Sequence, residues 1–269
     1  MSNNDAIGIF DSGVGGLTIW NEILKTLPFE STIYISDSAN APYGTKSAQE
    51  IINLSISNTE KLIEKGAKLI VVACNTATTQ AIETLRQEFD IPFIGIEPAI
   101  KPAALASKTR SIAVLATHGT LESEHFSNAK DKFTQDVEVF SRVGEGLVTA
   151  IEKGKLHTKE LKALLKEHLD FLVNNNTDNL VLGCTHYPLL IPIIRELIGD
   201  SIAIVDSGLA VAEHTKRVLV SNGLLNDSSK LGSHALYTTK NLDVLKEIVV
   251  ELGRENQLNI TYSSLYQSE

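Results

Sequence analysis

The stretch NLVLGCTHYPLL, residues 179–190, holds one of the chain's two cysteines. It begins with a short apolar run that does not alternate with polar residues. This pattern is typical of a strand buried on both faces of a parallel sheet. The run ends at Gly183 and Cys184, and a turn-forming sequence with a proline follows. We therefore predict a buried strand that carries a cysteine at its carboxyl end.

The same pattern of apolar run, turn and helical segment recurs along the chain. Strands that alternate with helices of about 10–15 residues predict βαβ units and mainly parallel sheets flanked by helices. The expected strands are residues 7–10, 32–37, 68–74, 92–96, 111–117, 136–142, 179–184 and 201–207. One further strand is expected at 237–239 and another at 260–265, with a helix between them.

Two pairs of segments resemble each other at nearly the same offset. IGIFDSGVGG (7–16) resembles IAVLATHGTL (112–121), and VVACNTATT (71–79) resembles VLGCTHYPLL (181–190). One matched pair is easily a coincidence, because parallel strands often end in small residues. Two pairs at a similar offset favour two related α/β halves.

Composition limits the class of protein. The 269 residues are 43% hydrophobic and 21% charged, which is typical of globular domains. No apolar run reaches the roughly 18 residues that a membrane span needs, and the N-terminal MSNNDAIGIF lacks the features of a secretory signal. The lack of secretory features and the presence of only two cysteines favour the cytosol, where thiols stay reduced. The net charge of −9 argues against nucleic-acid binding, which needs a basic surface.

Both cysteines fall at the ends of predicted strands, where open α/β sheets bind ligands. A disulfide is disfavoured in a reducing compartment, and a metal site is disfavoured because no CxxC motif is present. If Cys74 and Cys184 face each other across a ligand, one thiol can take a proton from a carbon while the other returns one to the opposite face. The plain alternative is that both are buried small apolar residues.

The neighbours of the cysteines favour a binding site. Asn75-Thr76 and Thr185-His186 follow them at the same place in each turn. They offer neutral donors and helix N-terminal N–H groups, which bind carboxylates without Arg or Lys. Asp11 and His186 are candidates to assist the thiols, although Asp11 also suits a helix cap and His186 a structural histidine. The other histidines, with no metal-ligand spacing, are expected at the surface or at caps: His118, His125, His157, His168, His214 and His234.

Taken together, these motifs resemble those of bacterial glutamate racemases, in order, from residue 7 to about 240. The matching segments are FDSGVGGL (10–17), SDSANAPYG (36–44), VVACNTAT (71–78), IGIEPAIKPA (94–103), LATHGTLES (115–123), LVLGCTHYPLL (180–190) and DSG (206–208). The resemblance implies a cofactor-independent isomerase that interconverts L- and D-glutamate and supplies D-glutamate for peptidoglycan. It also implies a cytoplasmic homodimer with no metal.

The resemblance assigns roles to residues of this chain. Cys74 would work on D-glutamate and Cys184 on L-glutamate, with Asp11 and His186 as auxiliary acid–base residues. The matching substrate-binding positions are Asp11, Ser12, Tyr43, Gly44, Asn75, Thr76, Thr117, Thr120, Thr185 and His186. The segment SRVGEGLVTAIEKG (141–154) lacks the family's usual Cys-Pro run, so Glu152 is carried over only as an auxiliary candidate, and a solvent-facing helix carboxylate is the favoured interpretation.

By resemblance, the fold is expected to have two lobes around an active-site cleft. Residues 1–97 with 210–269 would form the first lobe and 98–209 the second. Three other functions remain open at this point. They are a racemase for aspartate or another amino acid, a two-lobed binding protein with passive cysteines, and a thiol hydrolase or amidase that uses Cys184 with His186.

Overall fold

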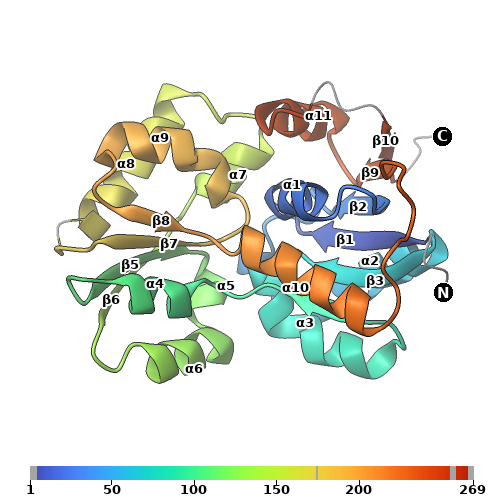
Figure 1. Ribbon diagram of the computed structural model, residues 1–269. Coiled ribbons are helices and arrows are strands. Elements are labelled where there is room, and N and C mark those ends of the chain that lie inside the picture. Colours follow the sequence, from blue (N-terminus) through green and yellow to red (C-terminus); the bar gives the residue numbers. More distant parts are fainter. Residues whose placement is uncertain (1–4, 174, 255–258, 266–269) are drawn as a thin grey trace. The chain divides into compact units, whose positions relative to one another are not determined.

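The protein folds into two compact units, each with a parallel sheet flanked by helices (Figure 1). The structure is a computed structural model that describes residues 5–173, 175–254 and 259–265. The first unit comprises Met1–Ile96 and Gly208–Glu269, and the second comprises Glu97–Ser207. The predicted α/β class with two related halves is confirmed.

The first unit contains a six-stranded sheet in the order β10-β9-β2-β1-β3-β4, with every neighbouring pair parallel. Helices α1 and α10 pack together, as do α2 and α3, and they flank the sheet (Figure 1). The elements are β1 (Ala6–Asp11), α1 (Leu17–Thr26), β2 (Thr32–Ser36), the 3₁₀ helix η1 (Tyr43–Thr45), α2 (Ala48–Glu64), β3 (Ala67–Val72), α3 (Asn75–Glu88), β4 (Phe93–Gly95), α10 (Gly208–Ser221), β9 (His234–Thr238), α11 (Leu242–Glu251) and β10 (Ile260–Ser264).

The second unit contains a four-stranded parallel sheet in the order β6-β5-β7-β8. Helix α4 packs with α6, and α8 packs with α9. The elements are α4 (Ile100–Ala106), β5 (Ser111–Ala116), α5 (His118–Leu121), α6 (Glu124–Phe133), β6 (Glu138–Val143), α7 (Leu147–Glu152), α8 (Lys159–Val173), β7 (Asn179–Gly183), the 3₁₀ helix η2 (Tyr187–Leu190), α9 (Ile191–Ile198) and β8 (Ala203–Val205).

The internal echo in the sequence has a counterpart in strand order. The order β6-β5-β7-β8 repeats the order β2-β1-β3-β4 of the first unit. In each sheet, the strand that precedes a cysteine pairs in parallel with the first strand of the repeat: β3 with β1, and β7 with β5. Within each unit, the carboxyl ends of these two paired strands therefore lie side by side.

All ten predicted strands are present, and two need a large correction. The strand predicted at 201–207 is much shorter, since β8 spans only Ala203–Val205. The sequence predicted 237–239, but β9 begins three residues earlier, at His234. Polar and apolar residues share its buried positions, since His234, Leu236 and Thr238 are all buried. A search for apolar runs therefore missed its first half.

A buried ion pair ties the amino end of β3 to the turn before β2. Lys68 Nζ lies 2.7 Å from Glu30 Oε2, and both side chains are almost wholly buried. The second carboxylate oxygen of Glu30 accepts the backbone N–H of Asn226 at 2.7 Å. The pair therefore also holds part of the connection between α10 and β9.

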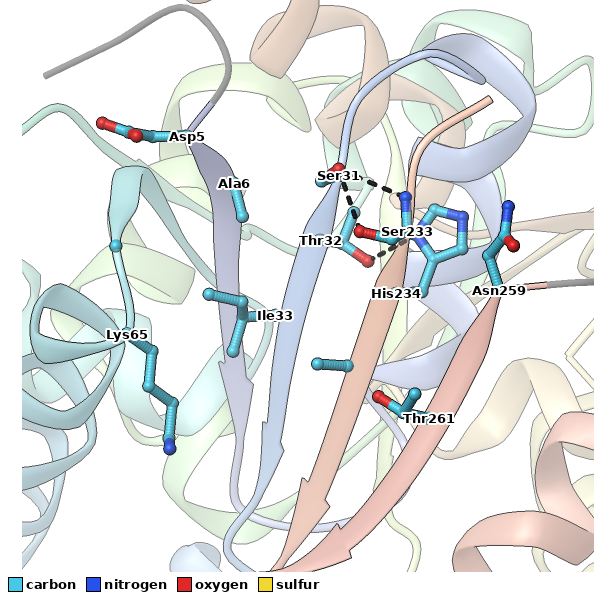
Figure 2. A pocket seen from close by; sticks show the side chains of 12 residues that line it. Asp5, Ala6, Ser31, Thr32, Ile33, Lys65, Ser233, His234, Asn259 and Thr261 are labelled. Atoms are coloured by element: carbon cyan, nitrogen blue, oxygen red, sulfur yellow. Dashed lines mark hydrogen bonds between the residues drawn. The ribbon is translucent and has the colours of Figure 1, made fainter. Parts of the chain in front are cut away.

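A polar hollow lies at the amino ends of β1, β2, β9 and β10, opposite the strand ends that carry the candidate site (Figure 2). Its volume is about 430 Å³. Trp20 Nε1 donates to Thr32 Oγ1 at 2.9 Å, and this hydroxyl lies 2.9 Å from His234 Nδ1. His234 is buried, so its expected surface or cap position is wrong. Burial, helped by the charge of Arg254, lowers the pKa of His234 to about 4.

We expect Lys68→Met to lower the free energy of unfolding by about 3–5 kcal/mol, because it leaves the Glu30 carboxylate buried without its partner charge. Adding Glu30→Gln should recover part of this loss. The chain has one tryptophan, so the fluorescence of Trp20 during urea unfolding reports on the first unit. Lys25→Met breaks the exposed Lys25–Glu22 pair and should cost about 1 kcal/mol or less. Equal losses in Lys68→Met and Lys25→Met would contradict the assigned burial.

The low pKa of His234 predicts acid sensitivity. Well above pH 6.5 this side chain is neutral in both the folded and the unfolded state, so it has no effect on stability there. As the pH falls towards 4, the unfolded chain binds a proton that the folded chain does not, so stability is lost. Between pH 7.5 and 4.5 this amounts to roughly 2–3 kcal/mol. Over this pH interval, His234→Gln should lose less free energy of unfolding than the wild type, by that amount. His157→Gln, which changes an exposed histidine, should lose as much as the wild type. The same acid dependence in all three proteins would refute the assignment.

Candidate active site

The candidate residues form two clusters, one at the carboxyl strand ends of each unit. In the first unit, Asp11 ends β1 and Cys74 follows β3. In the second unit, Thr117 follows β5 and Cys184 follows β7. Neither thiol is part of a disulfide, and both are buried, with 5% of Cys74 and 7% of Cys184 exposed. The sheet order thus gives each cysteine its own set of polar neighbours.

Cys74 caps the N-terminus of α3. Its sulfur accepts the backbone N–H of Ala77 at 3.4 Å and lies 3.6 Å from Ser12 Oγ. The thiol donates to the Ser12 hydroxyl oxygen, while the Ala77 N–H and the helix dipole interact favourably with a negatively charged sulfur. This environment suits a thiol that alternates between its protonated and ionised forms.

Asp11 is wholly buried and organises the turn after β1. Its carboxylate accepts the N–H of Ser12 at 2.6 Å, the hydroxyl of Ser12 at 3.1 Å and the N–H of Gly16 at 2.5 Å. The N-cap of α1 is Gly16, not Asp11. A Cβ at Gly16 would lie 2.6 Å from Asp11 Cβ, so a side chain there would displace the carboxylate.

Tyr43 belongs to a second polar group in this unit, together with Asp37. Its hydroxyl donates to Asp37 Oδ2 at 2.6 Å and receives a hydrogen bond from Asn58 Nδ2 at 3.2 Å. Burial, with the charge and hydrogen bond of Asp37, raises the pKa of Tyr43 well above 10, so it stays a neutral donor. Gly44 follows in η1. Asp37 was absent from the predicted site, although it follows β2 much as Asp11 ends β1.

Asn75 and Thr76 form the first turn of α3, and both are buried. Among the described residues, no donor lies within hydrogen-bonding distance of Asn75 Oδ1. An unsatisfied buried oxygen is costly unless a ligand or water supplies a donor. Asn75 therefore has a free acceptor for a ligand such as an ammonium group.

In the second unit, Cys184 is joined to a buried histidine–carboxylate pair. Its sulfur lies 3.8 Å from His186 Nδ1, and His186 Nε2 lies 2.6 Å from Glu152 Oε1. Burial alone would lower the pKa of His186. The hydrogen bonds and negative charges of Cys184 and Glu152 outweigh burial and raise this pKa well above 6.5. The imidazole is thus favoured in its protonated form, with one N–H directed at each neighbour.

The position of Glu152 corrects the favoured interpretation from the sequence. Its side chain is only 8% exposed and contacts His186, so it is not a solvent-facing helix carboxylate. It is the last residue of α7, whose apolar residues Leu147, Val148 and Ile151 are buried. No local signal marks this contact, because 34 residues separate the two partners.

The remaining candidates of this unit line the turns after β5 and β7. Thr117 caps α5, and its Oγ1 lies 2.8 Å from Thr120 Oγ1. Thr185, which lies between Cys184 and His186 in the sequence, is also buried. Tyr187 donates to the carbonyl of Gly144 at 3.2 Å. Burial and the charge of Cys184 raise the pKa of Tyr187 well above 10.

Residues 5–173, 175–254 and 259–265 contain no group of three or more His, Cys, Asp or Glu side chains arranged to hold a metal ion. They also contain no helix long and apolar enough to cross a membrane.

The chain is similar to known proteins in both sequence and fold. The sequence model of the Asp/Glu/Hydantoin racemase family matches residues 15–215. The chain belongs to this family. The family resemblance predicted from the motifs is confirmed.

Individual relatives agree with this assignment. The glutamate racemase of Ralstonia pickettii is 45% identical over 218 residues, which cover 81% of this chain and 77% of that protein. The Escherichia coli glutamate racemase, solved with L-glutamate and the activator UDP-MurNAc-ala, has a TM-score of 0.83 at 30% identity, covering 97% of this chain and 98% of that one. The Francisella tularensis enzyme, solved with D-glutamate, has a TM-score of 0.80 at 30% identity, covering 99% and 100%.

The His186–Glu152 contact predicts the titration of this histidine. Glu152→Gln keeps the shape of the side chain but removes a negative charge, so the pKa of His186 should fall. Two-dimensional NMR of the imidazole signals against pH measures this change. The matched control is Glu122→Gln, which neutralises an exposed carboxylate 3.2 Å from His118. This control should leave His186 unchanged. An identical His186 titration in Glu152→Gln and the wild type would show that the carboxylate does not support the imidazolium.

Proposed function

We propose that this protein is a glutamate racemase that interconverts L- and D-glutamate by a two-thiol mechanism without a cofactor. The mechanism rests on the presence of a buried cysteine, outside any disulfide, at the matching strand end of each unit. The names of the relatives and the family match support glutamate as the substrate. The two compact units support a division into two lobes near residues 97 and 209.

Racemisation requires that the α proton leaves one face of the carbon and that a proton returns to the other face. In the proposed reaction, Cys184 takes the proton from L-glutamate and Cys74 supplies one to give D-glutamate. The reverse reaction exchanges these roles, so each cysteine acts once as base and once as acid. Each turnover leaves the two thiols with their protonation states exchanged, and solvent restores them before the next.

The α proton of an amino acid is a weak acid, so the site must stabilise a developing carbanion. The turns Asn75-Thr76 and Thr185-His186 offer hydroxyl, amide and backbone donors for the substrate's carboxylates. The free Oδ1 of Asn75 can accept from the α-ammonium group. Ser12, Thr117, Thr120 and the Tyr43-Gly44 turn complete the proposed binding set.

The auxiliary groups differ between the two thiols. His186, favoured as an imidazolium by Glu152, offers a proton or a positive charge to the Cys184 sulfur. Asp11 lies in the turn whose Ser12 contacts Cys74. We assign both as auxiliary acid–base residues and assign Glu152 as the residue that orients His186.

The cellular role follows from the same resemblance. We propose that the enzyme works in the cytoplasm as a homodimer and supplies D-glutamate for peptidoglycan synthesis. Light scattering on purified protein tests the dimer, and rescue of a D-glutamate-requiring bacterium by this gene tests the metabolic role.

Substrate identity is tested by the loss of circular dichroism with equal concentrations of L-glutamate and L-aspartate. Glutamate should be turned over faster than aspartate. Faster turnover of aspartate would assign a different racemase. Tight binding of glutamate without optical change would indicate a binding protein with passive cysteines. Release of ammonia from an amide would favour a thiol hydrolase.

Replacing either thiol should stop racemisation but leave half of the chemistry. Cys74→Ala and Cys184→Ala should each lower racemisation by roughly 10²–10⁴-fold or more, since each removes a general acid–base group. In D₂O, Cys74→Ala should still exchange the α proton of L-glutamate, and Cys184→Ala that of D-glutamate. Proton NMR measures both rates, and each variant serves as the control for the other. Near-normal racemisation by either variant would rule out the two-thiol mechanism.

A further inference from the structure

The short helix α7 carries Glu152 at its end, and its start is held from outside the active site. The turn Gly144–Gly146 connects β6 to α7. Gly146 has a φ of 81°, and a Cβ at Gly144 would lie 2.3 Å from the Tyr187 hydroxyl. The path of this turn therefore determines where α7 begins.

A histidine on α8 binds the middle of this turn. His168 is 4% exposed, and its Nε2 lies 3.1 Å from the carbonyl oxygen of Glu145. Its Nδ1 accepts a hydrogen bond from Arg142 Nε at 3.3 Å. A carbonyl needs a donor and an arginine N–H needs an acceptor, so only the neutral ring with its proton on Nε2 satisfies both. The sequence suggested that His168 lies at the surface or at a cap. This prediction is wrong, because the side chain is buried.

The segment that follows Cys184 contacts the opposite side of the turn. Tyr187 donates to the carbonyl of Gly144, and it directly follows His186. The N–H of Ala150 then binds the carbonyl of Gly146 inside α7, and Glu152 meets His186 at the helix end. A continuous series of contacts therefore links His168 to the Cys184–His186 pair, although His168 touches neither.

We propose that His168 is a positioning residue for the Cys184 half-reaction. Its hydrogen bond to the Glu145 carbonyl fixes the start of α7, and α7 in turn keeps the Glu152 carboxylate against His186. The assignment to a half-reaction rests on the proposed racemase function. The positional claim is tested without activity.

The test compares His168→Leu, which removes the donor, with His168→Gln, which keeps an N–H group. In His168→Leu the pKa of His186, followed by NMR, should fall as it does in Glu152→Gln. In the double variant, adding His168→Leu to Glu152→Gln should not lower the pKa of His186 further. The carboxylate that His168 positions is already absent from that protein. His168→Gln should keep the wild-type titration. His125→Leu, on α6 of the same unit, is the control and should also leave His186 unchanged.

Racemisation provides the second readout. His168→Leu should lower kcat/KM for glutamate by about 10–100-fold, as small displacements of catalytic groups do, and His168→Gln should restore most of it. A folded His168→Leu with a wild-type His186 titration would overturn the proposal. If His168→Leu does not fold, a shifted titration in folded His168→Gln would overturn it instead. A wild-type protein that does not racemise glutamate, but shows the expected titrations, would refute the proposed function and leave the positioning role intact.

Discussion

Parallel pairing of two strands in each unit is the constraint on which the site depends. Because β1 pairs with β3 and β5 pairs with β7, their carboxyl ends lie at one edge of each sheet. Each cysteine is placed there by strands whose residues are almost all buried, so its position follows from the core and needs no dedicated loop. The turns at that edge add amides and hydroxyls, which bind anions without basic side chains.

The two cysteines of the proposed mechanism have different surroundings. Cys74 relies on the start of α3, which provides a partial positive charge and an N–H donor, and on a serine hydroxyl that accepts from the thiol. Cys184 relies on an ionisable histidine and a buried carboxylate. The shared strand order supports descent from a common α/β unit, while the side chains around the thiols have diverged. Such divergence lets each thiol be tuned separately within a common framework.

The sequence predicted what depends on local pattern. Buried apolar runs located the strands, and the cysteines stood out because they ended two of them. The sequence did not reveal the residues whose roles depend on tertiary contacts. Glu152 and His168 belong to helices with ordinary charged sequences, and only packing brings the first to His186 and the second to the Glu145 carbonyl. Asp37 follows a strand just as Asp11 ends one, so comparing strand ends within the chain would have found it.

The central claim is that two different thiols act on opposite faces of the α carbon. The most direct measurement uses wild-type protein with L-glutamate in D₂O, with no added cofactor, followed by NMR and circular dichroism at early times. The first D-glutamate formed should carry deuterium at the α position, while the remaining L-glutamate should keep its proton. D-glutamate that retains the original proton would contradict the central claim, because one base would then have carried that proton from one face to the other.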